Sequence, residues 1–160
     1  MPKIEAKLEQ MGLKLGEPIQ HPPSVVIPFS LVLVRGKHVY IAGHVPTNQD
    51  GSVAEPLGKV GGEVTLEQGY EAAKLIALGV LGDLKREIGD LDRVTGWGRV
   101  LGMVNAAPGF NQTTAVINGF SELILELYGP ECGAHSRSAV GVAALPLDAP
   151  VEIEAECDFD

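Results

Sequence analysis

The sequence has few of the residues on which nucleic-acid binding depends. Of its 160 residues only 12 are lysine or arginine, against 21 aspartate or glutamate, so the formal net charge is −9. Nucleic-acid-binding proteins usually carry a basic stripe, and no lysine- or arginine-rich run occurs here. We therefore expect no nucleic-acid partner, whereas a small anionic ligand is compatible with this charge if a cation is placed at one point.

Cysteine and long apolar runs are also scarce. Cys132 and Cys157 are the only cysteines, and their spacing fits neither a disulfide framework nor a metal site, so we expect two reduced thiols. No uncharged run approaches the roughly 18–20 residues that span a bilayer, and the first residues lack the basic and apolar segments of a secretory signal. These features predict a cytoplasmic protein without a membrane partner.

The motifs of metal and cofactor sites are missing as well. His21, His38, His44 and His135 are scattered, without the i, i+4 pairing or the Cys and Asp neighbours of a metal site. The glycines of residues 96–102 imitate a dinucleotide fingerprint with the wrong final spacing, and no phosphate-loop motif occurs. We expect neither a metal nor a cofactor.

What the chain does contain is a regular succession of short elements. Apolar spacing predicts helices at residues 3–13, 66–88 and 113–128, and β-branched runs predict strands at residues 29–34, 37–42, 94–104, 138–145 and 151–157. This order favours an α+β two-layer sandwich with the two long helices on one face of a sheet. The length fits one domain over residues 1–160, in which residues 1–24 form an N-terminal helix and extension.

The middle helix has the clearest boundaries. Thr65 followed by Gln68 matches a capping box, and Gly89 ends the apolar stripe. Gly69, Gly79 and Gly82 each cost roughly 1 kcal/mol inside a helix relative to alanine. We therefore expect them to allow close packing against the sheet.

Arg137 is the candidate ligand-binding residue. It stands at the start of a predicted strand, and strand alternation places Ala139 and Gly141 on the same face, which leaves open space beside the guanidinium. A guanidinium in such a place suits bidentate binding of a carboxylate. A structural ion pair with one of the 21 acidic side chains is an equally good interpretation of these residues.

The last predicted strand presents an acidic face. Glu152, Glu154 and Glu156 alternate with apolar residues, which is typical of a solvated outer face. If the last two strands form a hairpin, Glu152 pairs near Ala144, seven residues from Arg137, a separation of roughly 23 Å at about 3.3 Å per residue. On that condition the two side chains share a ligand only when different protomers supply them.

Several segments together resemble the RidA/YjgF family of imine deaminases, over about residues 25–157. The matching segments are residues 41–46 (IAGHVP), 70–73 (YEAA), 89–94 (GDLDRV), 116–119 (VING), 137–140 (RSAV), 145–146 (LP) and 151–154 (VEIE). The N-terminal helix is similar to a longer branch of the family that carries an endoribonuclease label. The resemblance implies a chorismate-mutase-like fold with a mixed sheet and a homotrimer that encloses a central barrel and holds ligand clefts between subunits.

The resemblance also implies a reaction, the hydrolysis of a 2-imino or enamine acid to a 2-oxo acid and ammonia without metal or cofactor. By this resemblance Arg137 anchors the carboxylate of the ligand and Glu152 positions or deprotonates water. Backbone groups near Gly43 and the side chain of Asn118 line the cleft.

Four further positions in the predicted ligand-binding set depart from the deaminase pattern. Phe29 and Ala139 stand where the family has a tyrosine and a cysteine, and His44 and His135 are polar groups that the pattern lacks. These departures leave a second function open, a non-catalytic module that binds a small carboxylate. Ribonuclease activity is a third, which the net charge and the lack of paired histidines disfavour.

Overall fold

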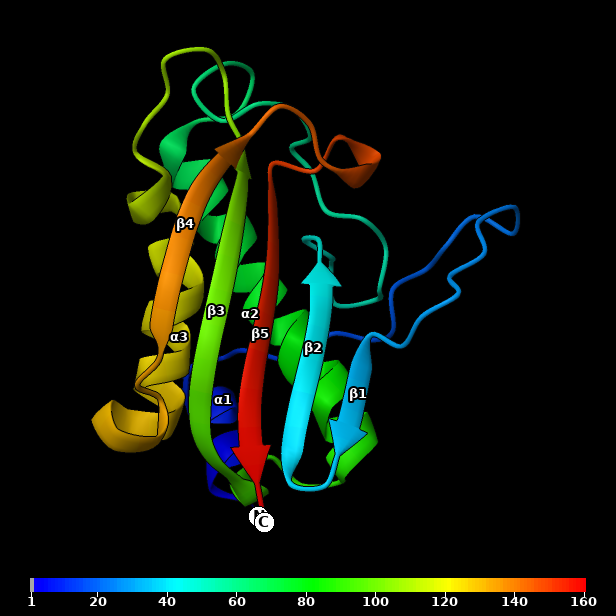
Figure 1. Cartoon of the computed structure of the whole chain (residues 1–160), viewed down its shortest axis with the longest axis vertical. Coiled ribbons are helices and arrows are strands. Elements are labelled where there is room, and N and C mark those ends of the chain that lie inside the picture. Colours follow the sequence, from blue (N-terminus) through cyan, green and yellow to red (C-terminus); the bar gives the residue numbers. More distant parts are fainter. Residues whose placement is uncertain (1) are drawn as a thin grey trace.

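The computed structural model describes residues 2–160 as one sheet with helices over one of its faces (Figure 1). The helices are α1 (Lys3–Gln10), α2 (Leu66–Ile88) and α3 (Thr113–Cys132), and two short 3-10 turns span Leu91–Arg93 and Pro146–Asp148. The strands are β1 (Val32–Arg35), β2 (His38–His44), β3 (Val94–Asn105), β4 (Ser136–Val142) and β5 (Val151–Phe159). This mixed α+β arrangement confirms the predicted element order.

The five strands are ordered β1-β2-β5-β3-β4, so the last two strands do not form the hairpin on which the separation of Arg137 and Glu152 was made conditional. β3 lies between them: β4 pairs with β3 in parallel, and β5 pairs antiparallel with both β2 and β3. α3 supplies the crossover that a parallel β3–β4 pair requires. β5 is central because its inner residues Val151, Ile153, Ala155 and Cys157 are all buried, which demands a neighbour on each side and helices beneath.

The helix boundaries follow the local chemistry. At the start of α2, the amide of Gln68 donates to Thr65 Oγ1 (3.1 Å) and the amide of Thr65 donates to Gln68 Oε1 (2.9 Å), which confirms the capping box. α2 ends at Gly89, whose φ of 85° suits glycine. In α3, Gly129 has a φ of 79° and breaks the helix one turn before its end, next to Pro130 and directly after the predicted end at residue 128.

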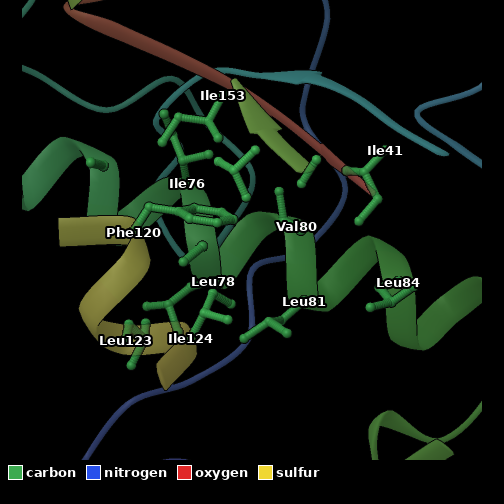
Figure 2. Packing of buried hydrophobic residues seen from close by; sticks show 14 of the residues in the cluster. Ile41, Ile76, Leu78, Val80, Leu81, Leu84, Phe120, Leu123, Ile124 and Ile153 are labelled. Carbon is green, nitrogen blue, oxygen red and sulfur yellow. The ribbon is translucent and has the colours of Figure 1, made fainter. Parts of the chain in front are cut away.

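The core lies between the sheet and the two long helices (Figure 2). Ile76 and Leu81 of α2 meet Phe120 and Ile124 of α3 there, beneath Ile153 of β5. Each fully buried side chain of this size contributes roughly 1.5–3 kcal/mol relative to its exposed state. With 5% aromatic residues, the core is built mainly of aliphatic side chains.

The expected packing of the α2 glycines against the sheet is wrong. A Cβ on Gly82 would collide with the carbonyl oxygen of Gly16, and Gly79 lies beside the same residue, whereas Gly69 faces Val116 of α3 and Val60. These glycines therefore allow the N-terminal chain and α3, rather than the sheet, to approach α2 closely. The approach at Gly16 positions the segment that forms one wall of the candidate site.

The other face of the sheet carries no helix (Figure 1). Glu152, Glu154 and Glu156 lie on it, which confirms the predicted outer face of the last strand. No helix in residues 2–160 combines the length and the apolar character needed to cross a membrane.

Candidate active site

Arg137 lies on the edge strand β4 and turns toward α3. Its Nη1 donates to Asn118 Oδ1 (3.1 Å) and Ser121 Oγ (2.9 Å), and its Nη2 donates to the carbonyl oxygen of Thr114 (3.3 Å). These three partners follow one another at positions i, i+4 and i+7 of α3, so they share one face of the helix. The structural ion pair is wrong, because no carboxylate in residues 2–160 lies within 4.0 Å of the guanidinium.

The hydrogen-bond acceptors around Arg137 are therefore all neutral groups. Three of its five N–H groups have partners within residues 2–160, and two remain for a ligand. Partial burial lowers the pKa of the guanidinium, which stays charged at neutral pH all the same.

His135 contacts Arg137 indirectly, through the hydroxyl of Ser121. Its Nδ1 donates to the carbonyl oxygen of Gly133 (2.8 Å), so its Nε2 accepts from the hydroxyl of Ser121 (2.8 Å), which in turn accepts from Arg137. A neutral imidazole satisfies every bond in this chain. His135 was predicted to bind the ligand, and in this chain it contacts Ser121 and positions Arg137.

Ala139 lies two residues beyond Arg137 on the same face of β4. Its carbonyl oxygen accepts a hydrogen bond from Thr113 Oγ1 (3.1 Å), and its side chain packs against the edge of the core. The methyl group leaves the space beside the guanidinium open. We name this group, residues Asn118, Ser121, His135, Arg137 and Ala139, the arginine half-site.

Glu152 lies on the opposite face of the sheet, beside a cavity of about 310 Å³. Its carboxylate lies over Gly43, where any Cβ would collide with it. Burial raises the pKa of Glu152, the neighbouring Glu154 raises it further, and His44 opposes both. Glu152 is thus a carboxylate with increased proton affinity, which suits a general base.

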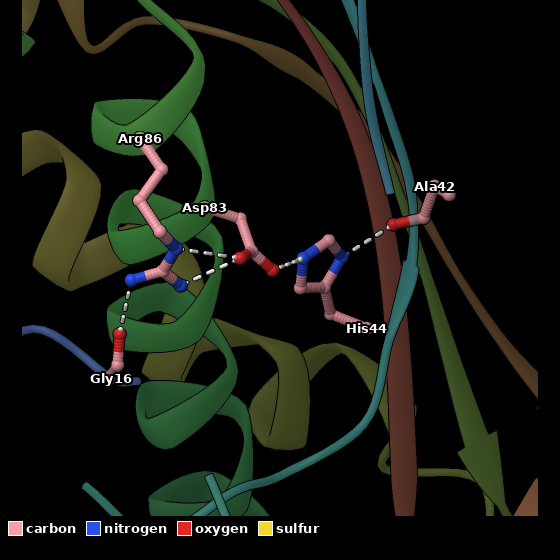
Figure 3. Close-up of polar contacts among 5 residues, drawn as sticks. All are labelled: Gly16, Ala42, His44, Asp83 and Arg86. Atoms are coloured by element: carbon pink, nitrogen blue, oxygen red, sulfur yellow. Dashed lines mark hydrogen bonds and ion pairs between the residues drawn. The ribbon is translucent and has the colours of Figure 1, made fainter. Parts of the chain in front are cut away.

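His44 lies in the wall of the same cavity and is 7% exposed. Figure 3 shows its polar contacts. Its Nδ1 contacts the carbonyl oxygen of Ala42 (2.7 Å) and its Nε2 contacts Asp83 Oδ2 (3.1 Å). Both partners are hydrogen-bond acceptors, so they hold the ring between β2 and α2. The ring is thus a buried polar group in the cavity wall that Glu152 also lines.

Asp83 and Arg86 connect His44 to the N-terminal chain through hydrogen bonds. Arg86 donates to Asp83 Oδ1 (2.6 Å) and to the carbonyl oxygen of Gly16 (3.0 Å) (Figure 3). Burial raises the pKa of Asp83, but the hydrogen bonds from His44 and Arg86 outweigh it, so the pKa is lowered. Asp83 therefore remains ionised between His44 and Arg86.

Phe29 belongs to the N-terminal strap, residues 16–31, and not to β1 as predicted. The strap is fixed near its ends, where the amide of Glu17 donates to Gln49 and the carbonyl oxygen of Leu31 accepts from Ala42, both at 2.8 Å. Between these points it projects beyond the β1 edge of the sheet (Figure 1). Phe29 lines the cavity and is 59% exposed. We name Phe29, Gly43, His44, Asp83 and Glu152 the glutamate half-site.

The structure thus separates the predicted site residues into two groups. Arg137 is paired with Val100 of β3 and turns toward the helices, whereas Glu152 is paired with Met103 and turns toward the open face. The separation of roughly 23 Å depended on the hairpin, which does not form. The two side chains are instead kept apart because they turn to opposite faces of the sheet.

The sequence interpretation missed Ser121, Thr114, Asp83 and Arg86. Ser121 and Asp83 interrupt apolar stretches of the two long helices, and a polar residue in such a stretch needs a buried partner. That signal indicates a polar cluster but does not name its partner. Within residues 2–160 no three His, Cys, Asp or Glu side chains gather as metal ligands.

These features define a two-layer α+β protein with a cationic half-site at one sheet edge and an anionic half-site on the open face. Comparison with known proteins identifies the family. The model described as "YjgF/chorismate mutase-like, putative endoribonuclease" matches residues 5–154. The chain belongs to this family, as the resemblance predicted.

Three relatives are similar over nearly the whole chain. Protein TCP17 of Trypanosoma cruzi is 35% identical, with 96% of this chain and 92% of that protein covered. The crystal structure of Atu1372 from Agrobacterium tumefaciens, of unknown function, is 32% identical with a TM-score of 0.85, covering 99% and 92% of the two chains. A putative endoribonuclease from Shewanella oneidensis is 26% identical with a TM-score of 0.86, covering 98% and 99%.

Proposed function

We propose that the protein hydrolyses small 2-imino or enamine acids to 2-oxo acids and ammonia, at clefts where the arginine half-site of one protomer meets the glutamate half-site of another. The observation that carries this proposal is the division of the site. One half offers a guanidinium with two free N–H groups, and the other offers a half-buried carboxylate of raised pKa. The arginine half-site has an anchor for an anion but no carboxylate base, and the glutamate half-site has a base but no such anchor.

The chemistry needs only these groups and water. Arg137 binds the carboxylate of the ligand through its two free N–H groups and holds the C=N carbon near Glu152. Glu152 takes a proton from water as the water oxygen attacks that carbon. Glu152 returns this proton to the nitrogen, which gives a tetrahedral adduct that carries a hydroxyl and an amino group. Glu152 then takes the hydroxyl proton and passes it to the amino group as the C=O bond forms and the C–N bond breaks, so that ammonia and the 2-oxo acid leave.

A homotrimer is the assembly we propose for this arrangement. The open face of the sheet exposes Tyr40 of β2 and Val140 of β4, at 48% and 41%, beside the acidic residues of β5. Another copy that covers this face removes apolar area from water and brings an edge strand close to a neighbouring strap.

A second candidate function is the non-catalytic binding of a small carboxylate. It is supported by Phe29 and Ala139, because a phenyl ring and a methyl group offer no proton donor or acceptor at two positions around the ligand. Ribonuclease activity has less support, since His44 and His135 lie in different half-sites and the net charge repels phosphate.

The deciding experiment generates 2-iminopropanoate in situ and follows its decay with the purified protein, whose assembly is measured by light scattering. We expect acceleration over buffer that Arg137→Ala abolishes. Arg35→Ala is the matched control, because Arg35 is exposed and contacts only the carbonyl oxygen of Val34. A trimer without acceleration refutes the enzyme, and calorimetry with pyruvate then tests the binding module.

A further inference from the structure

The cavity beside Glu152 is larger and more apolar than the smallest imino acids require. Its volume of about 310 Å³ is at the lower end of the roughly 300–1,000 Å³ that holds small-molecule ligands. Most apolar residues of its wall come from the N-terminal strap and from the turn before β5, among them Ile19, Pro22, Val26, Ile27, Leu31 and Leu147. A methyl group would leave most of this surface in contact with water.

Leu147 in this wall is held in an unfavourable backbone conformation. Its φ is 59° and its ψ is 19°, the left-handed region, which costs free energy for any residue with a Cβ. The side chain is also 47% exposed, so burial in this chain does not offset that cost. Such strain persists only where the surroundings impose it, and it is concentrated at functional sites.

The surroundings of the turn impose this conformation through Asp148. The carbonyl oxygen of Asp148 accepts from the amide of Gly58 (2.7 Å), and its Oδ1 accepts from Asn105 Nδ2 (3.3 Å). Asn105 is 1% exposed and its Oδ1 accepts from Lys59 (2.7 Å). A polar network around the buried Asn105 thus holds an apolar side chain at the wall of the cavity.

We infer that this cavity binds the apolar side chain of the ligand, a branched or aromatic group of four or more carbons, and that Leu147 determines this preference. The inference rests on the proposed function, since it names the side chain of the imino acid whose reacting carbon lies near Glu152. Phe29 fits the same interpretation, because a phenyl ring adds apolar surface where a phenol would add a hydroxyl.

The kinetic test compares the imines generated in situ from leucine and from alanine. Each buried methylene is worth about fourfold in binding, so the isobutyl substrate should exceed the methyl substrate in kcat/KM by at least about tenfold. An equal or lower value for the isobutyl substrate overturns the inference and leaves the proposed deaminase standing.

Leu147→Asn tests the residue itself. Asparagine tolerates the left-handed region, so the turn keeps its conformation while the wall loses an apolar group. The isobutyl-to-methyl ratio should fall by about fourfold, the value of one methylene contact. Leu57→Asn is the matched control, because Leu57 is an exposed leucine outside the cavity. An unchanged ratio in Leu147→Asn contradicts the assigned role.

A binding measurement separates this inference from the proposed function. Calorimetry with the product acids should show that 4-methyl-2-oxopentanoate binds at least about tenfold more tightly than pyruvate, and that Leu147→Asn reduces the difference. If no imine is hydrolysed but this preference is found, the deaminase is refuted and the inference holds. If imines are hydrolysed and the two acids bind equally, the inference alone fails.

Discussion

The two half-sites hold their charges in opposite ways. Arg137 is surrounded by neutral acceptors, and no carboxylate within residues 2–160 neutralises it. In the glutamate half-site, Asp83 contacts both His44 and Arg86, and the pKa of Glu152 is raised. This difference fits the roles that we propose, in which the arginine anchors an anion and the glutamate takes up a proton.

The largest effect is expected for Glu152→Gln, which removes the proton acceptor of the glutamate half-site. A general base contributes typically about 10²–10⁴-fold, so kcat/KM should fall by that factor. Because the folded pKa of Glu152 is raised, wild-type kcat/KM should decline with falling pH at values above the usual 4.5. Glu87→Gln, at the exposed end of α2, should change neither the rate nor the pH profile.

Arg137→Lys tests whether the other half-site needs the guanidinium or only its charge. An ammonium keeps the charge but loses the planar pair of donors. One lost hydrogen bond to a charged group costs about 1.5–3 kcal/mol, so kcat/KM should fall about 10- to 100-fold. If the lysine variant retains full activity, bidentate binding of a carboxylate is wrong.

Asp83→Asn should affect stability more than any change in the arginine half-site. Removing the carboxylate leaves the N–H groups of His44 and Arg86 without their charged acceptor. The free energy of unfolding, measured in urea, should fall by about 2–3 kcal/mol. Because the folded pKa of Asp83 is lowered, the wild-type advantage should be present above pH 3.8 and be lost as pH falls through the folded pKa.

The control is Asp158→Asn, in an exposed histidine–aspartate pair with His38 (2.7 Å). Such a surface pair is worth about 0–1 kcal/mol, so this variant should be nearly as stable as the wild type. Equal losses in the two variants would contradict the special role of the buried cluster.

The smallest effect is expected for Ser121→Ala, which removes a neutral link behind Arg137. One hydrogen bond of this kind contributes about 0.5–1.5 kcal/mol, so KM should rise several-fold while kcat changes little. Steady-state kinetics separates the two constants. A fall in kcat with unchanged KM would show that Ser121 does more than position the arginine.

The sequence predicted the helices and strands well, but it did not predict which strands pair with each other in the sheet. The capping box at Thr65 and the break at Gly129 are local signals, and both were confirmed. The order of strands was not local: the short turn at residues 146–150 allows a hairpin, but the apolar inner face of β5 required the centre of the sheet. Strand pairing depends on the burial of the whole sheet, which no single segment reveals.

The candidate site shows the same limit. Strand position singled out Arg137 and Glu152, the family resemblance supplied their expected roles, and the structure places both as accessible polar groups. The sequence did not predict the roles of Ser121 and Asp83, because each forms its hydrogen bond with a side chain that is distant in the sequence. The glycines of α2 were interpreted correctly as close-packing residues, but the partner at Gly82 is the N-terminal chain.

The most direct test of a site shared between protomers is complementation of two inactive variants. Arg137→Ala and Glu152→Gln are mixed, unfolded and refolded together, and 2-iminopropanoate decay is measured. Random assembly in a closed ring gives about one quarter of the clefts an intact Arg137 from one protomer and an intact Glu152 from its neighbour. We predict about one quarter of wild-type activity; mixed oligomers that remain inactive would contradict the shared site.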